Sequence, residues 1–456
     1  MVKNISGDIM PLIIEKLNSL KEKIPDLIIK EIKVAFGNFL YIVFLETTSS
    51  SDKINNYILK NIIDKKNKIT ENNINSFIAG PNTKTISVED VFKYISNGYV
   101  CLIIKHKTIA IEVKADINRN VNVPNTEPSL TGPKDAFTEN YQTNIGLIKR
   151  RIKDENLSIK NLTIGDRTKT NIGVMYLEDI IDKNLLNLIE NKIASLSINS
   201  IIDSRDLSLF LEHNSNSHFP TILKTERPDI ACKALLEGKI VISVDTSCYA
   251  LILPAYFCDF INPKVDDYSK KKNINFIKML RYFSFVISLL FPAFYISLIN
   301  YNQETIPTAL LVNFSIQRNG VPFPAVVEAF IMITLCEILR ESDLRFPNSY
   351  GSAISILGAL IIGEAAVSAG IVSPIMIIVI AITFITSLVF TEYELINALR
   401  YYRFLFLLIA AFYGIFGLVL SSICFIIKLN SINNYTSSYL YPIVSSSKKE
   451  NTKGQI

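Results

Sequence analysis

The sequence changes character at residue 283, where the run FSFVISLLFPAFYISLINYN contains no charged side chain. The run extends to residue 302 and has about the 20 residues that an α-helix needs to cross a bilayer. Long apolar stretches follow over residues 321–339, roughly 353–390 and 404–428. A soluble fold has no need for so many long, charge-poor segments. The sequence therefore predicts a polytopic α-helical transmembrane domain over residues 281–428.

A basic flank precedes the first apolar run and contains Lys270, Lys271, Lys272, Lys278 and Arg281. Cytoplasmic flanks of membrane helices are rich in Lys and Arg, so this flank and everything before it should lie in the cytoplasm. The number of crossings is open, because 353–390 forms either two spans or one span plus a re-entrant helix from Gly351. Four crossings leave the tail and Lys428 inside and move Arg400 and Arg403 outside, whereas five put the tail outside. The charges favour four.

Charge and cysteine content exclude several classes of protein. Lys and Arg number 47 against 42 Asp and Glu, and the whole excess lies in residues 1–282. So mild an excess argues against nucleic-acid binding, which needs a basic stripe, and suits a surface that faces an anionic membrane. The six cysteines form no CxxC pair, which argues against a disulfide framework or a zinc site. No removable signal peptide is expected at the N-terminus.

Catalytic motifs are missing from the sequence. EGKI ends in Ile and is no phosphate-binding loop, and neither GxSxG nor HExxH occurs. His213 and His218 stand in a polar segment, where a solvated role is commoner than metal binding. We therefore predict no catalytic residue, no metal and no cofactor, and we do not expect an enzyme.

Residues 1–280 are predicted to form a mixed α/β soluble domain of two subdomains that meet near residues 120–155. The β-rich runs cover 34–46, 99–113, 170–178 and 239–254, the last as a hairpin, and helical patterns lie near 52–65, 134–152, 183–197 and 228–237. Residues 429–456, which are polar at their end, are expected to form a flexible tail.

Residues 131–152, TGPKDAFTENYQTNIGLIKRRI, have the signals of a capped amphipathic helix. Gly132 is the expected N-cap, Pro133 suits the first helical position, and Asp135 suits the positive end of the helix dipole. One buried stripe is expected from side chains three or four positions apart: Phe137, Tyr141, Ile145, Ile148 and Ile152.

The segment TERPDIACKALLEGK repeats these signals. Pro228 opens a helix, Asp229 lies in its first turn and Gly238 ends it. Glu226 and Arg227 lie just ahead of the helix and are expected to pair across the domain.

The most informative apolar segment is GSAISILGALIIGEAAVSAG, residues 351–370. Gly351, Ser355, Ala359 and Gly363 recur every four positions and form a flat ribbon for close helix packing. Glu364 should face protein or water, since a carboxylate at membrane depth costs roughly 2.5 to 3.5 kcal/mol. It either lines an ion path in an oligomer, or makes an interhelical hydrogen bond or lies near the membrane interface. The same alternatives hold for Glu328 and Glu337, and a solvated loop of compensating charges is expected for Arg340, Glu341, Asp343 and Arg345.

Several of these segments together resemble the A subunits of bacterial spore germinant receptors, the GerA family. The matching residues are Gly132, Pro133, Lys134, Asp135, Ala136, Phe137, Glu139, Thr143, Asn144, Lys149 and Arg151, followed by Glu226, Arg227, Pro228 and Asp229. The similarity continues through LLEGK, VPFP at 321–324, LRESDLRFP at 339–347 and GEAAVSAGIVSP at 363–374. Thr131 departs from the usual Arg of the family, and Ser342 and Asp343 replace its usual Ala-Gly.

This resemblance implies a multi-pass subunit in the inner membrane of bacterial endospores, with its N-terminal domain in the spore core. The implied partners are a B-type subunit that binds the nutrient, a C-type lipoprotein subunit, and further copies of the chain in a pentamer. In that family the A subunit is thought to form a nutrient-gated ion channel, which here would open by repacking of residues 351–374. The alternatives are a paralogue resembling stage V sporulation protein AF, which amplifies germination without sensing nutrient, and a membrane-anchored scaffold or enzyme.

Overall fold

The computed structural model describes the chain from residue 17 to residue 443, with gaps. Outside the described residues lie 1–16, 20, 22, 36–37, 66–67, 72, 80–81, 89, 106, 115–123, 125–126, 128–131, 197, 213–216, 269, 344–362 and 444–456. The chain divides into two compact units. The first comprises Met1–His213 and Ile222–Pro254, and the second comprises Asn214–Thr221 and Ala255–Ile456.

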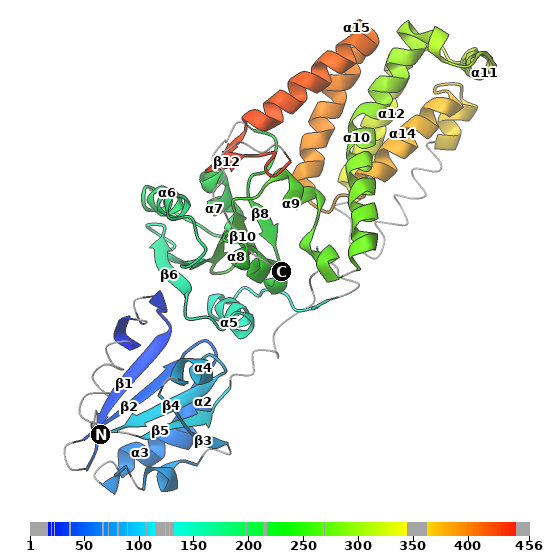
Figure 1. Cartoon of the computed structure of the whole chain (residues 1–456). Coiled ribbons are helices and arrows are strands. Elements are labelled where there is room, and N and C mark those ends of the chain that lie inside the picture. Colours follow the sequence, from blue (N-terminus) through cyan, green and yellow to red (C-terminus); the bar gives the residue numbers. More distant parts are fainter. Residues whose placement is uncertain are drawn as a thin grey trace. The chain divides into compact units, whose positions relative to one another are not determined.

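The first unit is mixed α/β and begins with a five-stranded antiparallel sheet (Figure 1). The sheet has the order β1-β2-β4-β5-β3 and consists of β1 (Leu27–Lys33), β2 (Phe39–Leu45), β3 (Thr83–Ile86), β4 (Tyr99–Ile104) and β5 (Lys107–Glu112). The accompanying helices are α2 (Ser51–Ile54), η2 (Asn55–Leu59), α3 (Lys60–Asp64), η4 (Ile74–Phe77) and α4 (Val91–Ile95). Side chains of a strand alternate between faces, so Leu102 packs with Ile58 of η2 while Ile103 packs with Ile95 of α4.

A second five-stranded antiparallel sheet follows, with the order β6-β7-β9-β10-β8. It consists of β6 (Leu157–Ile164), β7 (Thr170–Leu177), β8 (Leu223–Thr225), β9 (Ile240–Val244) and β10 (Ala250–Leu253). Its helices are α5 (Tyr141–Arg151), α6 (Lys183–Ala194), α7 (Ser204–Leu211) and α8 (Pro228–Leu236). The predicted hairpin over 239–254 is confirmed, because β9 and β10 pair antiparallel with Ile240 opposite Leu253.

The two sheets share one topology. When the strands of each are numbered by sequence, both read 1-2-4-5-3. Both also insert helical segments after the second and after the third strand. The first unit therefore contains two sheet modules with the same strand order.

Helix α5 begins later than the sequence predicts. It starts at Tyr141, and Asn140 is its N-cap, whose side chain accepts a hydrogen bond from the Thr143 N–H at 2.9 Å. Gly132 is not the cap; its backbone φ of 106° places it in the left-handed region that favours glycine. The predicted stripe is confirmed as buried: Phe137, Tyr141, Ile145, Ile148 and Ile152.

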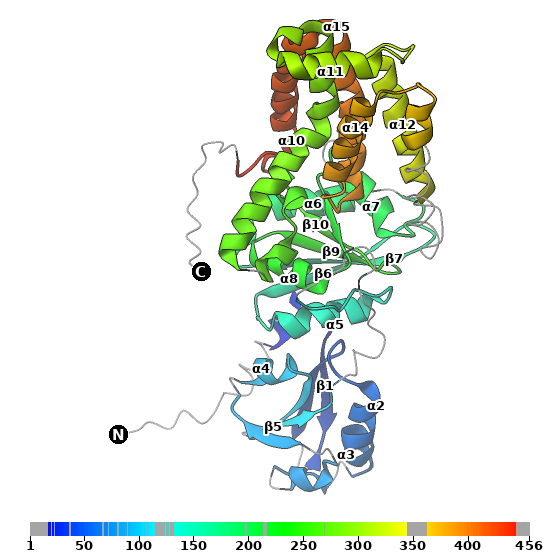
Figure 2. The same ribbon diagram turned by 90° about the vertical axis from the view of Figure 1, so that its right-hand side faces the viewer.

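The second unit is a helical bundle (Figure 2). Its elements are α9 (Phe257–Ile261), η6 (Lys264–Tyr268), α10 (Lys271–Tyr301), η7 (Gln303–Thr305), α11 (Thr308–Arg318), α12 (Ala325–Asp343), α14 (Pro374–Ser387) and α15 (Tyr393–Ser431). By length and composition, α10 and α15 are apolar enough to cross a membrane, and α14 is a shorter apolar helix. Residues 255–280 belong to this unit, although the sequence assigns them to the soluble domain.

Helix α15 consists of two antiparallel arms, which lie side by side in both overall views (Figures 1 and 2). The chain reverses at Gly414, where φ is 58° and ψ is −147°. The ring of Tyr402 in the first arm therefore packs on Phe425 in the second, with 4.8 Å between centroids. The stretch over 404–428, which the sequence presents as one apolar segment, thus folds back on itself.

The expectation of a flexible tail from residue 429 is wrong for residues 432–441. Strands β11 (Asn433–Asn434) and β12 (Ser437–Ser438) pair, and Tyr439 is fully buried. The Phe257 N–H donates to the Tyr439 carbonyl at 3.0 Å, and the Asn434 amide donates to the Ala255 carbonyl at 2.6 Å. The chain therefore returns to the start of the bundle, because aromatic and amide side chains anchor it there.

Candidate functional site

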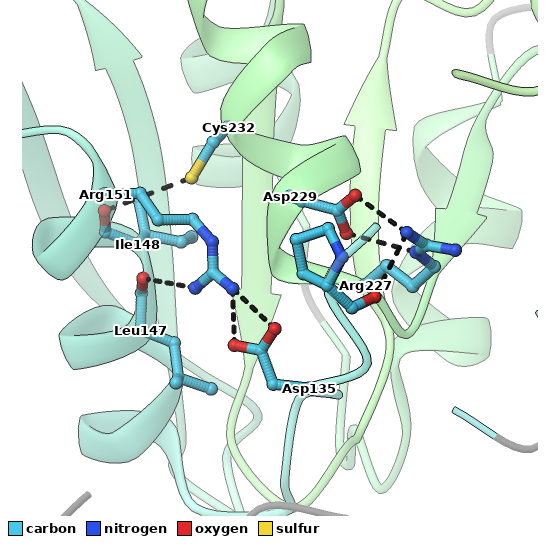
Figure 3. Close-up of polar contacts among 8 residues, drawn as sticks. Asp135, Leu147, Ile148, Arg151, Arg227, Asp229 and Cys232 are labelled. Carbon is cyan, nitrogen blue, oxygen red and sulfur yellow. Dashed lines mark hydrogen bonds and ion pairs between the residues drawn. The ribbon is translucent and has the colours of Figure 1, made fainter. Parts of the chain in front are cut away.

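The residues of the sequence signature form a clasp within the first unit (Figure 3). The signature clasp consists of residues 133–140, helix α5 and residues 225–232. It joins a segment that precedes α5 to the start of α8.

Arg151, in the last turn of α5, reaches back to the segment before the helix. Its Nη2 lies 2.6 Å from Oδ1 of Asp135 and also contacts Oδ2, and its Nη1 donates to the Leu147 carbonyl at 3.0 Å. The Arg151 and Asp135 side chains are 23% and 27% exposed, so water screens this ion pair in part. Asp135 therefore fixes the segment to the end of α5 and not, as predicted, to its start.

Arg227 and Asp229 form the buried centre of the clasp. Arg227 is 0% exposed; its Nε donates to Oδ1 of Asp229 at 3.1 Å and its Nη2 to Oδ2 at 2.8 Å. Pro228 occupies the first turn of α8 as predicted, and Asp229 lies beside it, where the helix dipole favours a carboxylate. The ion pair is local, and the link across the domain is the hydrogen bond from Arg227 to the Pro133 carbonyl at 3.4 Å.

Backbone groups complete the clasp. The Phe137 N–H donates to the Glu226 carbonyl at 2.7 Å. The Asn144 side chain accepts from the Thr138 N–H at 2.8 Å and donates to the Thr138 carbonyl at 2.6 Å. A helix from residue 134 would need these same groups for its own bonds. Competition from distant partners therefore explains why α5 begins at Tyr141.

Glu139 and Tyr141 connect the clasp to the second sheet and its loops. Glu139 is exposed, and its carbonyl accepts from the Thr246 N–H at 3.0 Å. The Tyr141 hydroxyl donates to Asn161 Oδ1 at 2.6 Å, and its ring covers Gly173, where an added Cβ would lie 2.3 Å from the hydroxyl oxygen. Gly173 is required there because no other residue leaves room for Tyr141.

Lys149 contributes a second buried ion pair that the sequence does not reveal. Although Lys149 lies in the basic end of α5, its side chain is buried and its Nζ contacts Oδ1 of Asp26. Thr47 donates to the other oxygen of Asp26 at 2.6 Å. Burial lowers the pKa of Lys149, and the Asp26 carboxylate opposes this effect. This pair links the two sheet modules, because Asp26 precedes β1 and Lys149 precedes β6.

Glu127 is a buried carboxyl that contacts the clasp at Thr225. Its Oε2 accepts from the Thr225 hydroxyl at 2.7 Å. Burial raises the pKa of Glu127 to about 7, which the Thr225 hydrogen bond and the Arg227 charge only partly offset. A carboxyl whose pKa is higher in the folded than in the unfolded chain stabilises the fold below its unfolded pKa, and this contribution is lost as the pH rises through the folded value.

We therefore expect the clasp to loosen between pH 5 and pH 8. Its free energy of opening should fall by about 1 to 3 kcal/mol, since one unit of pKa shift corresponds to about 1.4 kcal/mol. Amide hydrogen exchange of residues 223–229 in the full chain, corrected for intrinsic exchange, measures this. Glu127→Gln should abolish the pH dependence, and an equal dependence in that variant would assign it to another group.

The ribbon of small residues is described only in part. Gly351, Ser355 and Ala359 lie outside the described residues. An added Cβ at Gly363 would meet nothing within 4 Å. Glu364 is exposed on a helical segment at 363–368, and its carbonyl accepts from the Ser368 hydroxyl at 2.6 Å. Among the described residues, nothing therefore covers Gly363, and the Glu364 side chain is exposed.

Glu328, in contrast, is fully buried inside the bundle. Its Oε2 accepts from the Ser373 N–H at 3.0 Å and from the Ser373 hydroxyl at 2.8 Å, and Arg318 lies 3.6 Å from Oε1. In a single chain, Glu328 therefore makes an interhelical hydrogen bond, which is one of the roles expected for it.

Glu337 lies in a group of arginines that the sequence analysis did not bring together. Its two oxygens pair with Arg400 at 2.7 Å and Arg403 at 3.1 Å, and Arg403 also donates to the Ser288 carbonyl at 2.9 Å. Arg403 therefore lies beside the middle of α10.

Arg340 belongs to the same group. It is part of α12 together with Glu341 and Asp343, so the predicted solvated loop is wrong for these three, and Arg345 lies outside the described residues. Arg340 Nη2 donates to the Ser387 hydroxyl at 2.6 Å. A pattern of charges just inside apolar runs, at residues 337–340 and 400–403, is the only sequence signal of this grouping.

Comparisons with known proteins agree with the signature. A family model described as "Bacillus/Clostridium GerA spore germination protein" matches residues 15–455. Spore germination protein KA of Bacillus subtilis (strain 168) is 41% identical over 325 residues, which cover 71% of this chain and 60% of that protein. The chain thus matches less than two thirds of that relative's length.

Two further proteins are similar. Spore germination protein XA of Bacillus anthracis is 34% identical over 358 residues, covering 78% of this chain and 73% of that protein. The crystal structure of the N-terminal domain of the A subunit of the Bacillus megaterium spore germinant receptor GerK3 covers 54% of this chain and 94% of that domain, with 26% identity and a TM-score of 0.40. The names of these relatives refer to spore germination and not to a catalytic activity.

Proposed function

Because the chain belongs to the Bacillus/Clostridium GerA family of spore germination proteins, we propose that it is the A-type membrane subunit of a nutrient germinant receptor. The observation that carries this proposal is the family match over residues 15–455, which includes both the α/β unit and the bundle. The B-type and C-type subunits are the proposed partners, and the α/β unit is proposed to lie in the spore core.

The surface of the bundle supports a location in the membrane. Large apolar side chains on the second arm of α15 are more than half exposed: Phe416, Val419, Leu420, Ile423, Ile426 and Ile427. Soluble monomers rarely expose contiguous apolar patches of this kind. Lipid or other subunits would cover them, in keeping with the length and composition of α10 and α15.

The course of the chain supports an even number of crossings. Residues 255–261 lie beside the first half of α10, since the Phe257 and Phe285 rings are 5.1 Å apart. The tail returns to the same place through Tyr439. The tail then shares the side of the basic flank before α10, which the positive-inside rule assigns to the spore core.

We further propose that copies of the chain assemble, as a pentamer, around an ion path lined by Glu364. The exposed carboxylate of Glu364 supports this, because no described residue lies within 4 Å of a Cβ added at the neighbouring Gly363. Nutrient binding to the B-type subunit would then shift the packing of residues 351–374 and admit cations.

Two substitutions test the ion path in spores. Glu364→Gln removes the charge and Ala359→Leu fills the ribbon, and each should slow nutrient-triggered ion release at least tenfold while leaving receptor abundance unchanged. Flame photometry of the spore supernatant measures the release. The matched control is Glu304→Gln in η7, an exposed carboxylate outside the ribbon, which should behave as wild type.

The outcomes separate the alternatives. Normal ion release in both variants would refute the ion path but leave the receptor assignment intact. Failure to co-purify with a B-type subunit would refute the receptor assignment and favour an amplifying paralogue. Turnover of a substrate by the α/β unit would favour an enzyme.

A further inference from the structure

The strongest unassigned feature is the group of Arg340, Arg400 and Arg403, which we call the arginine cluster. Three guanidinium groups gather around the single carboxylate of Glu337, which pairs with Arg400 and Arg403. Arg340 and Arg400 both repel Arg403 electrostatically. Like charges held together in an apolar bundle destabilise one another unless an anion offsets them.

The cluster also has more donors than acceptors. Nη1 of Arg340, Nη2 of Arg400 and Nη2 of Arg403 are buried and have no hydrogen-bond acceptor among the described residues. Nε of Arg400 and Oε2 of Glu337 lie 2.7 Å apart as an ion pair, but neither makes a hydrogen bond with a described residue. Arg403 as a whole is only 1% exposed. Buried donors are almost always satisfied, and a guanidinium presents a planar fork that matches the oxygens of a phosphate or carboxylate.

The cluster opens to the surface on one side. Arg400 and Glu337 keep 17% and 15% of their side chains exposed, so a group from outside can reach the fork. The rings of Tyr393 and Phe384 flank it, with Arg400 5.9 Å from the first centroid and Arg340 5.0 Å from the second. The Ser288 carbonyl accepts a hydrogen bond from Arg403 and closes the cluster on the side of α10.

The position along α10 points to the source of the anion. Ser288 follows Arg281, the last residue of the basic flank, by seven residues, or about 10 Å at 1.5 Å per residue. Long arginine side chains at this depth reach the level of lipid phosphates. We propose that the arginine cluster binds a phosphate-type oxyanion, presented by the headgroup of an anionic phospholipid in the leaflet next to the basic flank.

The lipid source rests on the membrane location proposed above, whereas the oxyanion chemistry does not. Full-length protein purified in a non-ionic detergent is titrated with dioctanoyl phosphatidylglycerol and, separately, with inorganic phosphate. Native mass spectrometry counts the bound molecules, and the thermal midpoint followed by circular dichroism reports their effect. We expect one tightly held phosphatidylglycerol per chain and a higher midpoint.

Arg340→Gln, alone and with Arg400→Gln, should weaken this binding about tenfold or more. Arg340 suits the test because it does not pair directly with Glu337, so its loss leaves that pair intact. The control is Lys428→Gln, since Lys428 is an exposed cation of the same bundle that rests on the Tyr402 ring; it should bind as wild type.

Loss of phosphate binding in the Arg340 variant, with no binding of the lipid by wild type, would support the oxyanion site and overturn its lipid source. Equal losses in the Arg340 and Lys428 variants would reduce the effect to general charge attraction and overturn the site. An Arg340 variant that keeps its lipid but separates into smaller oligomers would also overturn the site. That result would mean that the cluster binds an acidic side chain of a neighbouring subunit.

Discussion

Asp229→Asn is expected to lower the stability of the signature clasp by about 3 to 5 kcal/mol, the cost of leaving one partner of a buried ion pair unpaired. Arg227 is fully buried, and both of its bonds to Asp229 end on carboxylate oxygens. An Asn side chain offers one acceptor and turns an N–H group toward the guanidinium. Nη1 of Arg227 already has no acceptor among the described residues, so the site has no spare partner for the charge.

Cys232 supplies a local measurement. It lies in α8 with its Sγ 3.9 Å from the Ile148 carbonyl oxygen, and burial raises its pKa to about 12. The thiol reacts only when α5 and α8 separate. Asp229→Asn should therefore speed alkylation of Cys232 in the full chain by about two to three orders of magnitude, since each 1.4 kcal/mol corresponds to about tenfold.

Two further variants distinguish a buried charge from a general defect. Arg227→Met with Asp229→Leu removes both charges together and should restore slow alkylation in large part, because apolar residues often replace a buried pair without loss. Arg151→Ala breaks the partly exposed pair with Asp135 and should cost about 1 kcal/mol or less. If Asp229→Asn accelerates the reaction no more than Arg151→Ala does, the Arg227 pair is not the centre of the clasp.

The elements that could be predicted from the sequence are those set by neighbouring residues. Pro228 begins α8 and Gly238, at a φ of 79°, follows its end, because both residues act on the backbone next to them. The hairpin over 239–254 and the buried stripe of α5 follow from local periodicity in the same way. The start of α5 does not, since the bonds that keep residues 133–140 extended come from Glu226 and Asn144.

The arginine cluster shows the same limit in the bundle. Glu337 and Arg403 are far apart in the sequence, and each stands with one other charge at the edge of an apolar run. The fold brings the first arm of α15 beside the middle of α10, where Arg403 meets Ser288, and the chain then reverses at Gly414. A glycine in an apolar helix is common in membrane segments, so the sequence gives no reason to expect a reversal there.

Gly414 is therefore the residue on which the fold of the bundle most depends. Its φ of 58° and ψ of −147° lie where residues with a Cβ are strained by about 1 to 3 kcal/mol. An added Cβ would also lie 2.9 Å from Cγ of Tyr301. That ring cannot move freely, because the Tyr301 hydroxyl donates to the carbonyls of Ala411 at 2.7 Å and Phe412 at 3.0 Å, at the end of the first arm.

We expect Gly414→Ala to separate the two arms of α15. Leu405 of the first arm and Cys424 of the second line one groove of about 520 Å³, so Leu405→Cys should cross-link to Cys424 with a short bismaleimide in the otherwise native chain. Adding Gly414→Ala should reduce the yield at least fivefold. Gly320→Ala is the matched control, since an added Cβ there meets nothing within 4 Å.

Tyr301→Phe separates the two contributions at the reversal. It removes the hydroxyl but keeps the ring. One hydroxyl proton shared between the two carbonyls contributes about 0.5 to 1.5 kcal/mol, so the cross-linking yield should fall less than that of Gly414→Ala. An undiminished yield in Gly414→Ala would mean that the arms stay together without the glycine. Arg403 would then owe its place beside Ser288 to the contacts of the first arm alone.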